Sequence, residues 1–169
     1  MLPIFLKEAV TACGGSFNGG NKVNTDSLTI KSVSIDTRTI EPGDFYIATP
    51  GERFDGHEFL KEALEKGACG AMVDEATFRR EWGDPLAWLN KNFPQSFLWT
   101  INDTRLGLGK LGAYHRKRFP NLPVIVVGGS NGKTSTKEYL RHTLSGLGPV
   151  VWSQASFNND IGTPLTLLK

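Results

Sequence analysis

The residues best suited to chemistry form one glycine-rich run in the last third of the chain: Gly129-Ser130-Asn131-Gly132-Lys133-Thr134-Ser135. Glycines let the backbone curl so that successive N–H groups point at phosphate oxygens, and a helix that begins there adds partial positive charge. Lys133 would place its ammonium against the β- and γ-phosphates of ATP, and the Thr134 hydroxyl would be an oxygen ligand of Mg²⁺. The run therefore predicts a site for ATP and Mg²⁺ made by these seven residues.

The sequence on either side of this run supports that interpretation. Residues 123–127 are a continuous apolar stretch, typical of a strand buried on both faces of a parallel sheet. A helix is expected over 134–145 with Tyr139 and Leu140 facing inward, and a second strand over 150–152. The full GxxxxGK[ST] pattern has Gly where this chain has Val127, so the run is the shorter GxxGK[ST] form and indicates a subfamily. The alternative is a structural glycine turn with an exposed lysine.

A second group of candidate residues lies nearer the amino terminus. Asp36 and Arg38 stand two residues apart and would share one face of a strand. A structural salt bridge and a ligand contact are both open for this pair. His57 follows Gly56 at an expected helix start, where local capping and ligand contact are again both open.

The elements that must position these residues follow from periodicity. Strands are expected over 32–35, 45–48, 71–73 and 97–101, and helices over 2–13, 55–66, part of 78–94, and 103–119. Asp103 would cap the last of these helices, with Leu106, Leu111 and Tyr114 inward. Strands alternating with helices indicate an α/β fold, and the stiff stretch 120–123 marks a domain boundary.

Composition excludes other classes of protein. The chain has 169 residues with 39% hydrophobic and 10% aromatic side chains, which excludes collagen-like and disordered chains. Its longest apolar run is far shorter than the ~20 residues of a membrane-spanning helix. Cys13 and Cys69 lack metal-binding spacing and are expected to be free thiols of a reducing compartment.

Charge divides the chain into two parts. Residues 1–103 carry 10 basic and 15 acidic side chains, a net −5, whereas residues 104–169 carry 9 and 2, a net +7. A basic module indicates a phosphate-bearing ligand or nucleic acid. The basic cluster 116–118 is short and is interpreted as a solvated helix end.

Three stretches of the chain resemble the Mur ligase family. Gly129–Ser135 has the short phosphate loop of those enzymes. The run Asp36 to Phe45, continued by Gly51 to Phe59, resembles their N-terminal DSR…PGD(L/F)F…G…DGH.F pattern, with Thr37 in place of Ser. Residues 158–168 resemble the NN.IG.PLTLL segment of the members that add D-alanyl-D-alanine. The expected helix 103–119 also resembles the segment joining the family's first two domains.

This resemblance implies a reaction and a domain order. The reaction is ATP-dependent ligation of D-alanyl-D-alanine to UDP-N-acetylmuramoyl-tripeptide through an acyl phosphate, in peptidoglycan precursor synthesis. Residues 1–120 would be a mixed α/β domain that binds the UDP end of the substrate. Residues 121–169 would begin a mostly parallel α/β P-loop ATPase domain. The chain would then be the N-terminal portion of a ligase, inactive alone.

The resemblance also implies site residues and surroundings. Asp36, Thr37 and Arg38 would lie near the uridine diphosphate, and Asn158 and Asn159 near the substrate or nucleotide in the cleft. The full-length enzyme would be a cytoplasmic monomer without nucleic-acid partners or membrane insertion.

Other functions stay open. A related Mur ligase that adds the third peptide residue shares the N-terminal pattern. An unrelated P-loop kinase or NTPase would need a later acidic Mg²⁺ ligand, and after Glu138 the chain offers only Asp160. A non-catalytic nucleotide-sugar-binding module with a vestigial loop is the third alternative.

Overall fold

A mostly parallel five-stranded sheet forms the centre of the computed structural model, which describes residues 1–24, 27–51, 54–154 and 159–169. The strand order is β2-β7-β6-β5-β4, in which β4 to β7 are mutually parallel and β2 is an antiparallel edge strand. A separate antiparallel pair joins β1 to β3. The strand bounds are β1 Ile4–Phe5, β2 Ser16–Gly19, β3 Thr29–Ile30, β4 Val33–Ser34, β5 Phe45–Ile47, β6 Gly70–Asp74 and β7 Phe97–Ile101.

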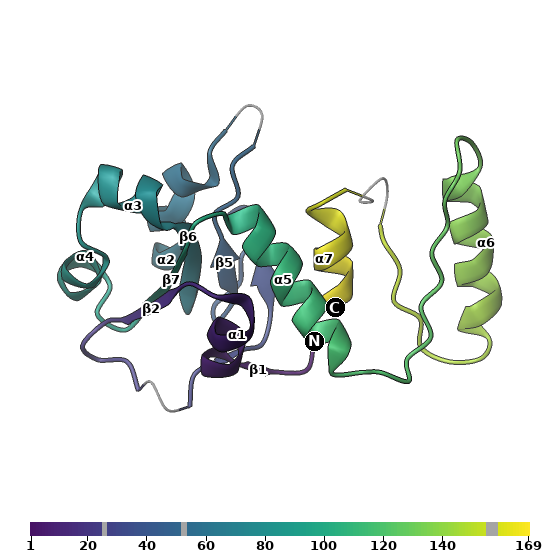
Figure 1. The fold of residues 1–169 in the computed structure, drawn as a ribbon, viewed down its shortest axis with the longest axis horizontal. Coiled ribbons are helices and arrows are strands. Elements are labelled where there is room, and N and C mark those ends of the chain that lie inside the picture. Colours follow the sequence, from purple (N-terminus) through teal and green to yellow (C-terminus); the bar gives the residue numbers. More distant parts are fainter. Residues whose placement is uncertain (25–26, 52–53, 155–158) are drawn as a thin grey trace.

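Helices cover both faces of this sheet (Figure 1). The helix bounds are α1 Leu6–Cys13, η1 Gly56–Phe59, α2 Leu60–Glu65, α3 Glu75–Trp82, α4 Pro85–Asn92, α5 Thr104–Lys117, α6 Lys133–Ser145 and α7 Gly162–Leu167. Side chains that alternate along the strands fill two cores. Phe45, Met72 and Trp99 pack with α1 and α5, whereas Tyr46 and Leu98 pack with α2, α3 and α4. The expected mixed α/β fold is confirmed.

Aspartates cap the N-termini of three of the α-helices. The carboxylates of Asp74, Asp84 and Asp103 each accept a hydrogen bond, at 2.8–2.9 Å, from the backbone N–H three residues later. Each bond satisfies a donor that the first helical turn leaves unpaired. The predicted cap at Asp103 is confirmed. The helical region 78–94 is two helices, because the chain turns at Gly83, which adopts a positive φ.

Two expectations in this part of the chain are wrong. The first helix begins at Leu6 and not at residue 2, because Ile4 and Phe5 pair with β3 instead. Leu106 is 64% exposed. The buried side of α5 follows Thr104, Leu108, Leu111 and His115, and Leu106 lies off that stripe.

The segment from residue 119 to 154 differs most from expectation. Residues 123–127 and 150–152 form no strand, and Val126 is 86% exposed. An apolar run becomes a buried strand only beside other strands, and the described residues place none next to these segments. Helix α6 is present but has no buried residue, and Tyr139, expected inward, is 76% exposed.

The carboxyl-terminal helix returns to the first part of the molecule. Helix α7 packs against α5, and Leu168 joins the same core as α1 and α5. A Cβ at Gly112 would lie 3.0 Å from the Pro164 Cα, so this contact depends on a glycine. Figure 1 shows α5 and α7 standing between the sheet and α6.

The two cysteines, Cys13 and Cys69, are both free thiols, as expected. Among the described residues, no helix combines the length and apolarity needed to cross a membrane. The basic cluster 116–118 lies at an exposed helix end, as expected, and two of its cations also make structural bonds: Arg116 Nη2 donates to Leu122 O at 2.8 Å and Arg118 Nη2 donates to Pro3 O at 2.9 Å.

Candidate functional site

The sheet collects polar segments at one edge. Strands β4 to β7 are parallel, so their carboxyl ends meet there. The Asp36–Arg38 turn follows β4, a loop from Ala48 follows β5, Asp74 ends β6, and Asp103 follows β7. Ligands of open α/β sheets bind at this edge. The geometry therefore brings the residues of the expected uridine site to a suitable place.

The Asp36–Arg38 turn is held by its own side chains. Arg38 Nε and Nη2 donate to the two carboxylate oxygens of Asp36 at 2.9 and 2.6 Å, and the Arg38 backbone N–H donates to Oδ1 at 2.9 Å. The side-chain hydrogen bond from Arg38 lowers the pKa of Asp36 to about 2. The Arg38 side chain is 86% exposed, so this salt bridge leaves a cation at the surface of the edge.

Lys66 ties this turn to the body of the protein. Its Nζ donates to Thr37 O at 2.9 Å and to Glu62 Oε1 at 2.7 Å. Thr37 is buried. Sequence reasoning missed Lys66, which lies 29 residues from Thr37, and no local pattern signals that contact.

The loop after β5 has two paired arms, residues 49–51 and 54–56. Gly51 N–H donates to Phe54 O at 3.0 Å, Gly56 N–H donates to Thr49 O at 3.1 Å, and Pro50 pairs with Asp55. A Cβ at Gly56 would lie 2.8 Å from the backbone of Thr49, so the arms approach too closely for a side chain. Glu52 and Arg53 of the family-like pattern lie outside the described residues.

His57 follows directly after the second arm, in η1. It is buried, its Nδ1 lies 2.6 Å from Asp55 Oδ1, and its Nε2 accepts the Asp74 backbone N–H at 2.8 Å. Asp55, not His57, is the helix cap, since it accepts the His57 backbone N–H at 3.0 Å. Burial raises the pKa of Asp55, but the hydrogen bonds from His57 outweigh burial and leave that pKa below its usual value.

The phosphate loop leads directly into α6. Gly129 and Gly132 adopt φ angles of 140° and 77°, a region that side chains disfavour. No side chain caps α6 at Gly132, so the first N–H groups of the helix are open to an anion. Lys133 is the first residue of α6, and its Nζ donates to Gly129 O at 2.6 Å and to Ser130 O at 3.0 Å.

The other loop residues are accessible. Ser130, Asn131, Thr134 and Ser135 are exposed, and a Cβ at Gly132 would meet nothing within 4 Å. Over the part of the chain that the structure describes, no three His, Cys, Asp or Glu residues gather to hold a metal.

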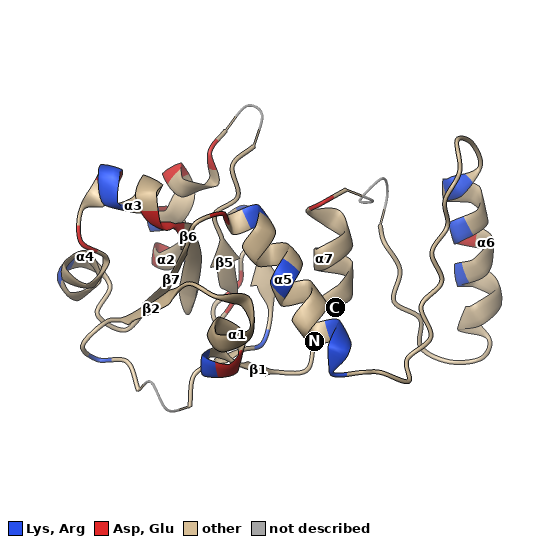
Figure 2. Cartoon of the chain, in the orientation of Figure 1, with Lys and Arg blue, Asp and Glu red and all other residues tan. Residues whose placement is uncertain are grey.

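The segment after α6 packs along the side of that helix. Lys137 Nζ donates to Ser153 O at 2.7 Å, and the Arg141 guanidinium lies 4.2 Å from the centroid of the Trp152 ring. The basic side of α6 appears in Figure 2 as a column of blue bands. Lys137 and Arg141 of α6 therefore hold residues 152–153 against this helix, and the sequence did not predict these contacts.

Asn159 has a structural contact at the start of α7. Its side-chain oxygen accepts the Gly162 backbone N–H at 2.8 Å. Thr163, interpreted from sequence as the helix cap, lies inside α7, because Ile161 occupies the cap position and Asn159 supplies the side chain. The next residue, Asp160, lies 3.6 Å from Arg105 of α5. Asn158 lies outside the described residues.

Comparison with known proteins adds two family matches. The Mur ligase family, catalytic domain, matches residues 29–86, and the Mur ligase middle domain matches residues 127–169. These two matches contain the Asp36–Arg38 turn and the phosphate loop respectively.

Individual proteins are also similar over most of the chain. UDP-N-acetylmuramoyl-tripeptide–D-alanyl-D-alanine ligase of Escherichia coli is 33% identical over all 169 residues. The ligase of the same name from Bacillus subtilis is 33% identical over 85% of this chain. The chain spans only 32% and 28% of those two relatives.

Solved structures agree with this similarity. A crystal structure of MurF from Acinetobacter baumannii matches with a TM-score of 0.77 at 34% identity, over 98% of this chain and 33% of that one. A MurF ligase from Thermotoga maritima in complex with ADP matches with a TM-score of 0.60 at 28% identity, over 82% of this chain and 29% of that one.

Proposed function

Because the chain belongs to the Mur ligase family, we propose that it supplies the uridine-nucleotide site and the phosphate loop of an ATP-dependent ligase. The reaction joins D-alanyl-D-alanine to UDP-N-acetylmuramoyl-tripeptide in peptidoglycan precursor synthesis, as the names of its relatives indicate. The observation that carries the proposal is the phosphate loop, where Lys133 and Thr134 begin a helix that no side chain caps.

The proposed roles of the two parts of the chain follow the two family matches. Residues 1–120 bind the UDP end of the substrate through Asp36, Thr37 and Arg38, and residues 121–169 begin the ATPase domain. Asn158 and Asn159 contact substrate or nucleotide between them. The two free cysteines fit a cytoplasmic enzyme, and the full-length ligase would act as a monomer without nucleic acid.

The chemistry proceeds in two balanced steps. The tripeptide carboxylate attacks the γ-phosphorus of ATP, the bond to the β–γ bridging oxygen breaks, and ADP leaves with that electron pair. The D-alanyl-D-alanine amine then attacks the acyl carbon, phosphate leaves, and the amine loses a proton. Negative charge moves onto the departing ADP in the first step, so a cation placed beside the phosphates lowers the barrier.

Lys133 and the N–H groups of residues 129–135 are the groups that this chain offers for that task. Two of the three Lys133 ammonium N–H groups bind loop carbonyls, which holds the side chain over the loop. The exposed Thr134 hydroxyl fits an oxygen ligand of Mg²⁺, which would neutralise phosphate charge. The ADP complex of the related Thermotoga maritima enzyme supports nucleotide binding by this fold.

Specific observations favour this ligase over the alternatives. The named relatives add D-alanyl-D-alanine, not the third peptide residue. Asp160, the one late acidic residue that a P-loop kinase would need, is paired with Arg105. A vestigial binding module would have no need to retain both Lys133 and Thr134.

Two substitutions test both halves of the proposal on this chain by isothermal titration. Lys133→Ala should weaken binding of Mg-ATP by at least about tenfold, the effect of losing one charged hydrogen bond, and leave UDP-N-acetylmuramoyl-tripeptide binding unchanged. Arg38→Ala should do the reverse. Each variant is therefore the control for the other, and Lys91→Ala, which changes an exposed side chain of α4, should change neither.

Equal affinity of Lys133→Ala and the unmodified chain for Mg-ATP would remove the phosphate loop from the proposal. A loss of ATP affinity in Arg38→Ala would move that residue to the ATP site.

A further inference from the structure

We propose that His57 is a positioning residue for the uridine-nucleotide substrate, because it fixes the paired arms (residues 49–51 and 54–56) at the carboxyl edge of the sheet. This inference rests on the proposed function, in which that edge binds the uridine nucleotide. His57 would act through Asp55 and would not itself touch the substrate, since it is only 3% exposed.

Two side-chain hydroxyls bind backbone carbonyls at the base of the arms. Tyr46 Oη donates to Gly56 O at 2.8 Å, and Thr104 Oγ1 donates to Ala48 O at 2.7 Å. Ala48 leads from β5 into the first arm and Gly56 ends the second arm, so both bonds hold the base of the arms. Neither reaches the outer residues, where Phe54 is 68% exposed. Beyond this base, the Phe54 ring meets the Phe59 ring, and Asp55 has a separate contact.

His57 supplies that contact to the outer arm. Asp55 belongs to the arm, pairs with Pro50 across it, and accepts both the backbone N–H and the ring Nδ1–H of His57 on one oxygen, at 3.0 and 2.6 Å. A side chain fixed by two bonds to one neighbour has little rotational freedom. The direction of the arm is thus set by the direction of the imidazole ring.

The ring in turn is fixed to the core. Its Nε2 accepts the backbone N–H of Asp74, the last residue of β6 and the cap of α3. Because Nε2 accepts, the ring proton lies on Nδ1, which is the arrangement that donates to Asp55. One neutral imidazole therefore connects a central strand to a surface arm, with each nitrogen in a different role.

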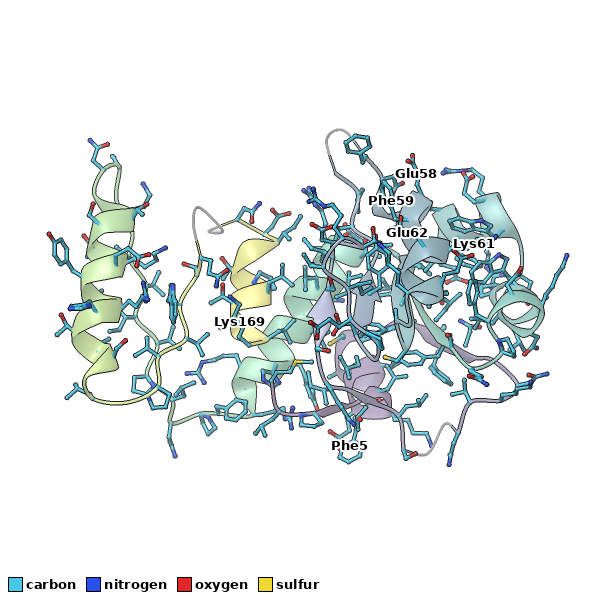
Figure 3. The ribbon with its side chains drawn as sticks, turned by 180° about the vertical axis from the view of Figure 1, so that it is seen from behind. Phe5, Glu58, Phe59, Lys61, Glu62 and Lys169 are labelled. Carbon is cyan, nitrogen blue, oxygen red and sulfur yellow. The ribbon has the colours of Figure 1, made fainter. Side chains whose placement is uncertain are left out.

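The surroundings place the arms beside the proposed site. Figure 3 shows Glu58, Phe59 and Glu62 on the η1–α2 segment that starts where the arms end. The Phe54 and Phe59 rings are 6.4 Å apart in an edge-to-face arrangement. Glu62 also binds Lys66, which holds the Asp36–Arg38 turn. The arms and the turn thus both contact the continuous η1–α2 segment.

Three variants separate positioning from simple stability. His57→Gln keeps an acceptor for the Asp74 N–H but loses the donor to Asp55. His57→Asn keeps a donor near Asp55 but loses the acceptor, and His57→Phe loses both. Four quantities are measured for each variant: the affinity for UDP-N-acetylmuramoyl-tripeptide, the affinity for Mg-ATP, the melting temperature, and the hydrogen-exchange rates of the Gly51 and Gly56 amides.

We expect the affinity for UDP-N-acetylmuramoyl-tripeptide to fall in the variants that lose the donor to Asp55. The melting temperature should fall in the variants that lose the acceptor for the Asp74 N–H. His57→Gln should melt near the unmodified chain, yet bind about tenfold more weakly and exchange the two glycine amides faster. His57→Asn should melt lower but bind within about twofold of the unmodified chain. Mg-ATP affinity should stay constant throughout.

The inference is overturned if affinity follows melting temperature across the three variants, or if His57→Gln binds and exchanges like the unmodified chain. If the unmodified chain does not bind UDP-N-acetylmuramoyl-tripeptide, the proposed function fails. The exchange of Gly51 and Gly56 then still reports whether His57 holds the arms, so the two failures are distinguishable.

Discussion

At the scale of single residues, the Asp36–Arg38 pair shows how local geometry sets charge. Asp36 receives a side-chain hydrogen bond, a backbone hydrogen bond and a positive charge from Arg38, and its pKa falls from 3.8 to about 2. Because the pKa in the folded chain is lower, the pair contributes stability above pH 3.8, and that contribution is lost as the pH falls through about 2. Both side chains are accessible, so its effect on global stability is small.

This pair gives a measurable prediction. In a carboxyl-carbon NMR titration, Asp36 should titrate with a midpoint near pH 2, and in Arg38→Ala the midpoint should rise toward 3.8. Lys66→Ala, which removes a more distant charge, should raise it less. A midpoint that does not move in Arg38→Ala would contradict the bidentate contact.

At the scale of secondary elements, two of the three glycines of α5 have opposite roles. A Cβ at Gly109 would meet nothing within 4 Å, whereas a Cβ at Gly112 would lie 3.0 Å from Pro164 Cα and 3.3 Å from its carbonyl oxygen. Gly109 therefore weakens the helix and makes no close packing contact possible, whereas Gly112 leaves the space in which α7 packs against α5. Helix propensity favours Ala over Gly by about 1 kcal/mol at either position.

The two glycines form a matched pair of variants. Gly109→Ala should raise the free energy of unfolding by up to about 1 kcal/mol and the melting temperature by about 2–4 °C. Gly112→Ala should lower that free energy by about 1 kcal/mol, because overpacking against α7 outweighs propensity. Equal stabilisation by both variants, measured by thermal denaturation, would show that α7 shifts to accommodate the added methyl group without lowering the free energy of unfolding.

The elements also show what the sequence can predict. Strands β5, β6 and β7 and the Asp103 cap followed from apolar runs and local spacing, because those signals act within a few residues. Asp36 and Arg38 were expected to share one face of a strand, with a salt bridge and a ligand contact both open; they form a salt bridge, but on a turn. The bonds from Lys66 to Thr37 and from His57 to Asp74 join residues 29 and 17 positions apart, and no periodicity reports them.

The largest error has the same physical origin. Residues 123–127 have the composition of a buried strand, but burial depends on neighbouring strands that composition does not supply. The phosphate loop was predicted more completely, because its glycines, its lysine and the helix that follows are consecutive in sequence. Local backbone conformation was therefore predictable where long-range pairing was not.

At the scale of the whole molecule, stability is distributed unevenly. Both hydrophobic cores lie on the sheet and on the helices around it, including the end of α7. No residue between 119 and 154 is buried, a stretch that the structure describes throughout. Helix α6 is held from the side by Lys137 and by the Arg141–Trp152 contact. A segment without buried apolar contacts opens locally at a low cost in free energy.

Native-state hydrogen exchange should therefore resolve two levels of protection. Amides of α6 should exchange at least about a hundredfold faster than those of β7, because α6 opens without unfolding the sheet. Phosphates bound at the α6 N-terminus hold only the folded helix, so Mg-ATP at about 100 times its Kd should slow α6 exchange by about a hundredfold and leave β7 unchanged. Equal protection of α6 and β7 without ligand would show that they unfold together. Binding of Mg-ATP without any slowing at α6 would place the nucleotide away from Lys133, whereas slowing confined to α6 would place its phosphates at the helix that Lys133 begins.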